Sequence, residues 1–349
     1  VVDGQTDDTL TVTKLGFVGG YASGNAGNGE GGAIDLPSSS DSPLVISDSV
    51  FINNRSKFDG GAINHAGSSL LSISSSRFEG NVSVNDEGGA INSDYGSVQI
   101  SNSTFANNYA TLSGGAIHAD SLSPGYTSAV PVVVTGSTFI GNTNEFDLSG
   151  NQKGGAISAL KGRPLTLVDD TFIGNRSSYG GAVYSDNPVS ITNSVFTENG
   201  ATDGGGSVYA DGPATVNGSV FADDSALGDG GSLYADDSLT IVNSSFTNAY
   251  VGGEGGAIRV DEDAYILNST FTDNEAKYQG GAIYVQGTDT SIRVVDSAFV
   301  SNVSGDDGGA IYGFYNFYVY SSSFTDNVAS YRGGALYIDD TGGVSQSSF

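Results

Sequence analysis

Residues 224–284 read DSALGDGGSLYADDSLTIVNSSFTNAYVGGEGGAIRVDEDAYILNSTFTDNEAKYQGGAIY and contain the repeat that decides the fold. A Gly-Gly pair followed by a small and an aliphatic residue recurs every 25 residues, starting at Gly230, Gly255 and Gly280. Between the pairs stands a Ser-x-Phe motif, which ends at Phe246 and Phe271. A fixed period of roughly 20 to 50 residues is typical of stacked supersecondary units, so this stretch predicts a repeat protein.

Both motifs recur along all 349 residues of the chain. Glycine pairs start at Gly31, Gly60, Gly88, Gly114, Gly154, Gly180, Gly205, Gly230, Gly255, Gly280, Gly308 and Gly333. The matching phenylalanines are Phe17, Phe51, Phe78, Phe105, Phe139, Phe172, Phe196, Phe221, Phe246, Phe271, Phe299, Phe324 and Phe349. The repeat is therefore a property of the whole chain.

Composition argues against several classes of partner. The formal net charge is −27, from 12 basic and 39 acidic residues. Nucleic acids and anionic membrane surfaces attract basic patches, so neither is an expected partner. The chain has no Cys, and we therefore expect no disulfide, thiolate metal site or Cys nucleophile. No run approaches the roughly 18 apolar residues of a membrane span.

One repeat contains short alternating strands and no helical period. Leu239 and Ile241 alternate with Thr240 and Val242, and the preceding Asp236 and Asp237 are typical of a turn. Coils of this kind, stacked with parallel strands about 4.8 Å apart, form a solenoid. We predict an all-β fold: a single-stranded, right-handed parallel β-helix of about 12 coils with a period of about 25–28 residues, spanning 1–349 as one domain.

Alternation predicts which side chains point inward. Phe and the Ser two residues before it share a face, and the size of Phe places that face inside. Asn recurs three residues after Phe, at a turn where an amide can bond the equivalent amide one coil away. This structural ladder contains Asn54, Asn81, Asn108, Asn142, Asn175, Asn199, Asn274, Asn302 and Asn327.

Departures from the period predict corner insertions near residues 23–30, 36–43, 121–131 and 144–153. Insertions in a solenoid lie at corners and often face a ligand or partner. The alternative is drift in tolerant surface loops.

Acidic residues precede the glycine pair in three consecutive coils, at Glu30, Asp59 and Glu87. Carboxylates stacked at strand spacing repel one another unless a hard cation bridges them. This pattern predicts a site for Ca²⁺, and the alternative is a solvated acidic corner. No cofactor is required by the sequence.

An aromatic stripe occupies the position four residues after the first Gly of the pair. Because the flanking aliphatic residues point inward, these side chains are expected to point outward and to stack, with an Arg placed for cation–π contact. The stripe is either a sugar- or partner-binding surface or a set of strand residues that stack well. It contains Tyr184, Tyr209, Tyr234, Arg259, Tyr284, Tyr312 and Tyr337.

Sequons of the type Asn-x-Ser/Thr fall into two groups. Those at Asn54, Asn81, Asn175 and Asn302 belong to the ladder and should be sequestered. The outward-facing group, where we expect glycosylation, contains Asn102, Asn217, Asn243 and Asn268.

Catalysis is not expected. Neither His65 nor His118 has an evident partner in the sequence, and the latter falls at the exposed stripe position. Adjacent acids such as Asp236 and Asp237 fit turns.

Residues 7–17, DDTLTVTKLGF, and residues 339–349, DDTGGVSQSSF, are the same half-coil. Open coils template further strands. We therefore expect the partner to be the chain itself, stacked head-to-tail, or further repeats of a longer chain.

The Gly-Gly-Ala-Ile and Phe-x-x-Asn motifs together resemble the repeat of chlamydial polymorphic outer-membrane proteins and related β-helical surface adhesins. The resemblance covers nearly the whole chain, although the cysteines common in that family are missing. It implies a surface-exposed or secreted shaft that is structural or adhesive. The Gly-Gly-Ala-Ile motif starts at Gly31, Gly60, Gly88, Gly114, Gly154, Gly255, Gly280 and Gly308.

The sequence therefore favours a non-enzymatic, extracellular or cell-surface structural protein, a β-helical shaft that forms or belongs to a filament or fibre. The alternative is an adhesin passenger that binds glycans or a host protein. A polysaccharide-degrading β-helix enzyme is the third alternative.

Overall fold

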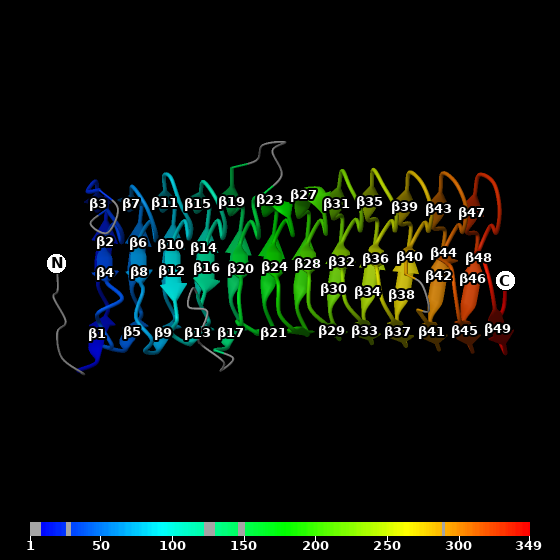
Figure 1. Ribbon diagram of the computed structural model, residues 1–349, viewed down its shortest axis with the longest axis horizontal. Helices are drawn as coiled ribbons and strands as arrows, with labels where there is room; N and C mark the ends of the chain where they lie inside the picture. Colours follow the sequence, from blue (N-terminus) through cyan, green and yellow to red (C-terminus); the bar gives the residue numbers. More distant parts are fainter. Residues whose placement is uncertain (1–7, 26–28, 122–129, 146–150, 288–289) are drawn as a thin grey trace. The chain divides into compact units, whose positions relative to one another are not determined.

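The computed structural model describes residues 8–25, 29–121, 130–145, 151–287 and 290–349. The predicted all-β parallel β-solenoid is confirmed, with about 11 turns. Strands follow one another in groups of four, and within each of the two units given below a strand pairs in parallel with the strand four places further along the chain (Figure 1). The four resulting sheets are called A, B, C and D in the order in which the chain enters them. Parts of the insertions expected near 23–30, 121–131 and 144–153 lie outside the described residues.

The chain divides into two compact units, 1–187 and 188–349. In unit 1, sheet A contains β1 (Leu10–Thr13), β5 (Leu44–Ser47), β9 (Leu71–Ser74), β13 (Val98–Ser101), β17 (Val132–Thr135) and β21 (Leu165–Val168). Sheet B contains β2 (Gly16–Val18), β6 (Val50–Ile52), β10 (Arg77–Glu79), β14 (Thr104–Ala106), β18 (Thr138–Ile140) and β22 (Thr171–Ile173). Sheet C contains β3 (Tyr21–Ala22), β7 (Arg55–Ser56), β11 (Val82–Ser83), β15 (Tyr109–Ala110), β19 (Thr143–Asn144) and β23 (Arg176–Tyr179). Sheet D contains β4 (Ile34–Leu36), β8 (Ile63–His65), β12 (Ile91–Asp94), β16 (Ile117–Asp120), β20 (Ile157–Ala159) and β24 (Val183–Ser185).

Unit 2 repeats this arrangement. Its sheet A contains β25 (Val189–Thr192), β29 (Ala214–Asn217), β33 (Leu239–Val242), β37 (Ala264–Leu267), β41 (Ile292–Val295), β45 (Phe317–Tyr320) and β49 (Gly342–Ser345). Sheet B contains β26 (Val195–Thr197), β30 (Val220–Ala222), β34 (Ser245–Thr247), β38 (Thr270–Thr272), β42 (Ala298–Val300) and β46 (Ser323–Thr325). Sheet C contains β27 (Gly200–Gly204), β31 (Ser225–Ala226), β35 (Tyr250–Val251), β39 (Glu275–Ala276), β43 (Val303–Ser304) and β47 (Val328–Ala329). Sheet D contains β28 (Val208–Ala210), β32 (Leu233–Ala235), β36 (Ile258–Val260), β40 (Ile283–Val285), β44 (Ile311–Gly313) and β48 (Leu336–Ile338).

Stacked phenylalanines fill the core beneath sheet B. In unit 1 the rings of Phe51 and Phe78 lie 4.6 Å apart and nearly parallel, and both are fully buried. In unit 2 the rings of Phe246 and Phe271 lie 5.1 Å apart. These separations follow the strand spacing, because each Phe pairs in register with the Phe of the next coil.

The glycine pair forms the corner that leads into sheet D. The first glycine adopts a left-handed conformation, as Gly60 does at φ +61°. The second lies against the backbone of the next coil: a Cβ on Gly61 would lie 2.0 Å from the carbonyl oxygen of Gly89. A side chain is thus excluded at both positions, which explains why the pair recurs.

Candidate functional site

The outer side of sheet D carries the charged and aromatic clusters of both units. Its strands begin with an inward aliphatic residue, so the second residue of each strand faces outward. In unit 1 these outward residues include Asn64, Asn92 and His118, and all three are buried. Side chains from the corner segment before the glycine pair reach over them: Glu30 Oε2, for example, accepts a hydrogen bond from Asn64 Nδ2 at 3.1 Å. The stripe position is therefore not the exposed surface that its sequence pattern predicts.

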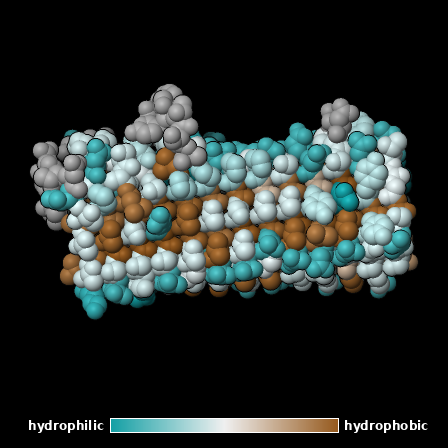
Figure 2. Space-filling model, turned by 90° about the horizontal axis from the view of Figure 1, so that it is seen from below, coloured by the Kyte–Doolittle hydropathy of each residue, from teal (hydrophilic) through white to brown (hydrophobic). Residues whose placement is uncertain are grey.

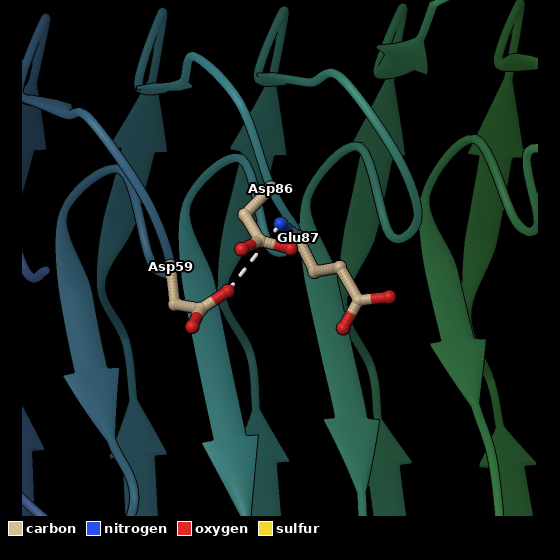
Figure 3. Close-up of side chains that lie close together, drawn as sticks. All are labelled: Asp59, Asp86 and Glu87. Carbon is tan, nitrogen blue, oxygen red and sulfur yellow. Dashed lines mark hydrogen bonds between the residues drawn. The ribbon is translucent and has the colours of Figure 1, made fainter. Parts of the chain in front are cut away.

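Three carboxylates converge at this corner of unit 1, and we call Asp59, Asp86 and Glu87 the acidic cluster (Figure 3). One oxygen from each lies within 4.8 Å of the other two. The backbone N–H of Glu87 donates to Asp59 Oδ1 at 3.5 Å. Burial raises the pKa of Asp59 to about 7, and the negative charges of Asp86, Asp94 and Glu87 add to this shift. The carboxyl group of Asp59 therefore keeps its proton to a higher pH than an ordinary aspartic acid does.

The membership of this cluster differs from the predicted stack. Asp59 and Glu87 come together as the pattern indicates, but Glu30 bonds Asn64 instead. Asp86 takes the third place, because it lies in the same corner segment as Glu87, between β11 and β12. The repeat pattern does not identify Asp86, since the neighbouring coils carry no acid at the equivalent position.

His118 adds a basic group to the cluster. Its side chain is fully buried, and its Nε2 lies 2.8 Å from Glu87 Oε2. Burial by itself lowers the pKa of His118. The carboxylates of Glu87, Asp94 and Asp120 raise it by more, so the pKa lies above its usual value. The expectation that His118 is exposed and has no partner is wrong, because its partner comes from the preceding coil, 31 residues earlier in the chain.

A second polar group, formed by Lys161, Arg163 and their partners, lies close by, and the repeat pattern does not predict it. Lys161 Nζ bonds Asp120 Oδ2 at 2.8 Å. Arg163 is fully buried, with Nη2 3.5 Å from the carbonyl oxygen of Ser93. Burial, together with the Arg163 charge, lowers the pKa of His65 to about 4. The only sequence signal for these contacts was the break in hydrophobic alternation around residues 161–163.

In unit 2 the outer side of sheet D carries aromatic rings and one guanidinium. Tyr209 and Tyr234 stack with their ring centroids 4.5 Å apart. Arg259 lies 5.1 Å from the Tyr234 ring and 5.5 Å from the Tyr284 ring. The stack continues from Tyr284 through Tyr312, at 5.3 Å, to Tyr337, at 5.0 Å. Arg259 thus fills the gap between two Tyr stacks.

Several of these rings are not on the surface, which corrects the expectation of an exposed stripe. Tyr284 and Tyr312 are only 5% and 8% exposed. In unit 1 Tyr184 is 2% exposed, its hydroxyl accepts a hydrogen bond from Lys153 Nζ at 2.6 Å, and Lys153 lies over its ring. The reason is the same as for His118: corner side chains lie over sheet D.

Arg259 also neutralises the acidic corner of unit 2. Its Nη1 contacts Asp229 Oδ2 at 2.6 Å and Glu254 Oε2 at 3.1 Å, and its Nε contacts Asp261 Oδ1 at 3.0 Å. Asp229 and Glu254 occupy the same repeat position as Asp59 and Glu87. Each unit thus places a basic side chain against the acids of this corner. In unit 1 it is His118, and in unit 2 it is Arg259.

Comparison with known protein families matches three segments of the chain, 102–120, 268–286 and 321–339, to the Chlamydia polymorphic membrane protein repeat. These three segments are similar to that repeat. The match at 268–286 includes the Phe271, Asn274 and Gly280 positions of the motif. No match to a curated protein or to a solved structure was found. Among the described residues, no helix is long and apolar enough to span a bilayer.

The Phe-x-x-Asn motif, which each of the three matched segments contains, builds an amide ladder. Asn81 Nδ2 donates to Asn108 Oδ1 at 2.9 Å and to the carbonyl oxygen of Phe51 at 3.0 Å. The backbone N–H of Asn81 also donates to Asn108 Oδ1. Asn327 is half-buried, and the other members of the ladder are buried: Asn54, Asn81, Asn108, Asn142, Asn175, Asn199, Asn274 and Asn302.

The second sequon group lies on the exposed corner between sheets A and B of the same repeats. In unit 2 these residues form an outer ladder, with Asn268 Nδ2 donating to Asn243 Oδ1 at 2.7 Å and Asn243 Nδ2 to Asn217 Oδ1 at 3.4 Å. The exposed residues are Asn102, Asn217, Asn243 and Asn268.

Proposed function

We propose that the chain is a non-enzymatic β-helical shaft at the cell surface or outside the cell, which forms or belongs to a filament by head-to-tail stacking of coils. The family repeat supports a surface role. The observation that carries the filament proposal is that successive coils make the same contacts, Phe on Phe and Asn on Asn, in register. A coil surface built this way is complementary to a further coil of its own kind.

Two described coils present such a surface. Phe349 is 67% exposed although it stacks on Phe324 at 5.0 Å, and Phe17 is half-buried where it stacks on Phe51. The Phe residues of the coils between them are buried. A further coil, from additional repeats of a longer chain or from a second copy, would cover these rings and the unpaired strand groups beside them.

Electron microscopy and light scattering of the purified chain at rising concentration test this proposal. We expect rods that lengthen with concentration, and a Phe349→Lys chain that stays short. Tyr278→Lys is the matched control, because Tyr278 is exposed on a lateral corner and should not affect lengthening. Short rods at every concentration, or equal lengthening by the Phe349→Lys chain, would contradict stacking between copies. A natural polypeptide heavier than 35.4 kDa after removal of sugar would instead identify further repeats as the partner.

Adhesion to glycans is the second candidate, and a hollow on the outer side of sheet A in unit 2 favours it. Tyr318 and Tyr320 are 56% and 45% exposed, and with Arg293 and Val295 they line a hollow of about 450 Å³. Figure 2 views sheet A from outside and shows hydrophobic residues in brown among neutral ones in white. Exposed rings beside a guanidinium suit the apolar faces and hydroxyls of sugars. Binding of neutral oligosaccharides that survives Tyr318→Ala would contradict this assignment.

We further propose that the exposed sequons at Asn102, Asn217, Asn243 and Asn268 carry glycans in a host that glycosylates. Their exposure supports this, whereas the ladder asparagines are enclosed by the stack. Glycopeptide mass spectrometry should find sugar on the exposed group. Sugar on Asn81 or Asn175 would contradict the inward placement of the ladder.

A further inference from the structure

One guanidinium stands alone on the outer side of sheet A in unit 2. The second and fourth residues of each strand face outward there, and Arg293 is the only charged residue at these positions in the strands of this sheet, all of which lie in the described part of the chain. The other two arginines of unit 2, Arg259 and Arg332, both form ion pairs with carboxylates. Among the described residues, Arg293 forms none. In a chain with a net charge of −27, this exposed cation is therefore open to an anion from outside.

The side chains of the neighbouring coils open a slot beside this guanidinium. Arg293 pairs in register with Tyr265 of the preceding coil and with Tyr318 of the following one. The guanidinium lies over the Tyr265 ring at 5.8 Å. The Tyr318 ring lies toward Gly343 of the last coil, because its Cδ1 is 3.8 Å from the place that a Cβ on this glycine would take. Arg293 and Tyr318 thus lean apart, and both line the hollow of about 450 Å³ described above.

The rest of the hollow is apolar and aromatic. Val295 and Tyr320 pair in register and lie beside Arg293 and Tyr318, at the outward position two residues further along their strands. Tyrosine offers an apolar ring face with a polar tip, which suits the C–H face and the hydroxyls of a pyranose ring. An apolar surround also strengthens the attraction between a guanidinium and a carboxylate, because it displaces water from the pair.

We propose that this hollow binds a carboxylated sugar, a uronic acid residue of an oligosaccharide, with the sugar ring against Tyr318 and its carboxylate on Arg293. The inference rests on the adhesive candidate function and names the class of its ligand. A guanidinium fork matches the two oxygens of a carboxylate, so the pair fixes the orientation of the sugar as well as adding affinity. A neutral sugar would leave the one cation of this face without a partner. The acids elsewhere on the chain weaken this attraction little, because salt at about 0.15 M screens charges beyond about 8 Å.

Isothermal titration calorimetry on the full chain tests the proposal, with an oligogalacturonate of defined length as the probe. The matched ligand is the same oligomer with its carboxylates methyl-esterified, which keeps the rings and removes the charges. The buffer is free of calcium, since Ca²⁺ would compete for the carboxylates of the sugar. We expect the parent chain to bind the acid more tightly than the ester, by about tenfold or more. Raising NaCl from about 50 to about 500 mM should weaken binding of the acid and not of the ester.

Two variants separate the carboxylate contact from the ring contact. Arg293→Gln should bind acid and ester equally, at the affinity that the parent chain has for the ester. Tyr318→Ala should weaken binding of both. Arg176→Gln is the matched control, because Arg176 is an exposed arginine of β23 in unit 1 and does not line the hollow, and it should bind like the parent chain.

The outcomes distinguish this inference from the function on which it rests. If the parent chain binds acid and ester equally, or if Arg293→Gln keeps the preference for the acid, the carboxylate assignment is wrong, while adhesion to glycans through Tyr318 stands. If the parent chain binds neither oligomer, both are wrong. Sedimentation velocity without sugar tests a second copy as the occupant: an association of the parent chain that Arg293→Gln abolishes would assign the hollow to a carboxylate of that copy and overturn the proposal.

Discussion

Asp224 replaces an asparagine of the amide ladder, and Asp224→Asn should therefore change how stability depends on pH. The carboxyl lies three residues after Phe221, is 1% exposed, and its Oδ1 accepts the backbone N–H of Asn199 at 3.0 Å. The next coil carries Ala249 at this position, which cannot supply an amide. Burial raises the pKa of Asp224 to about 7, and hydrogen bonds from Ser207 and Asn199 offset only part of the shift.

The sign and size of the effect follow from this shift. The unfolded carboxyl has its ordinary pKa of 3.8, so between that value and about 7 the folded chain holds a proton that the unfolded chain has lost. Stability is then highest at low pH and falls as the pH rises through 7. At about 1.4 kcal/mol per pKa unit the full loss is about 4 kcal/mol, of which about 2–3 kcal/mol lies between pH 5 and pH 8. Asn cannot ionise, and its Nδ2 can donate to the Phe196 carbonyl as Asn274 donates to that of Phe246.

Urea denaturation of the parent chain and Asp224→Asn at pH 5 and pH 8 measures this difference. The stability advantage of the variant should grow by about 2–3 kcal/mol from the lower to the higher pH. Asp273→Asn, an exposed change of the same kind, should show no such growth. An advantage that is equal at the two pH values would show that Asp224 is already ionised in the fold, and would refute the reasoning.

Three further predictions concern the core and the charged corners. Phe246→Ala removes a fully buried ring from a stack and should lower the free energy of unfolding by about 3–5 kcal/mol; unchanged thermal unfolding would mean that Phe faces outward. Asp170→Ser restores the usual residue of the Ser-x-Phe motif, and because burial raises the pKa of Asp170 to about 7, its gain in urea denaturation should be larger at pH 8 than at pH 5. Arg259→Met leaves the half-buried Glu254 without its guanidinium and should cost about 2–3 kcal/mol, whereas Arg77→Met, at an exposed pair, should cost less than about 1 kcal/mol in the same assay.

The sequence predicts the coil because its core residues repeat with the coil itself. A Phe that recurs in register stacks on its neighbour, and an Asn three residues later finds an identical Asn one strand spacing away. These contacts depend only on position within the repeat. They could therefore be placed from residue types and spacing alone, without knowledge of where the corners run.

The outer side of sheet D could not be placed in the same way. Whether His118 or Tyr184 is buried depends on side chains of the corner segments, whose lengths vary from coil to coil in unit 1. The contact between Lys153 and Tyr184 likewise joins a corner insertion to a strand. Alternation predicts whether a strand side chain points inward or outward. It does not predict whether side chains from a corner segment cover an outward-pointing one.

The acidic corner shows how a repeat protein of this charge compensates the carboxylates that its own repetition brings together. When a repeat that carries an acid before its glycine pair is copied, the acids are placed about one strand spacing, ~4.8 Å, apart and repel one another. The repetition cannot relieve this, because each further identical coil adds another acid. Relief requires a residue that breaks the pattern, and Arg259 and His118 are such breaks at the same repeat position. The guanidinium spans two corner acids and closes its network with Asp261. The imidazole pairs with Glu87, and its positive charge also lowers the pKa of Asp59 and Asp86, against the burial and the neighbouring acids that raise it.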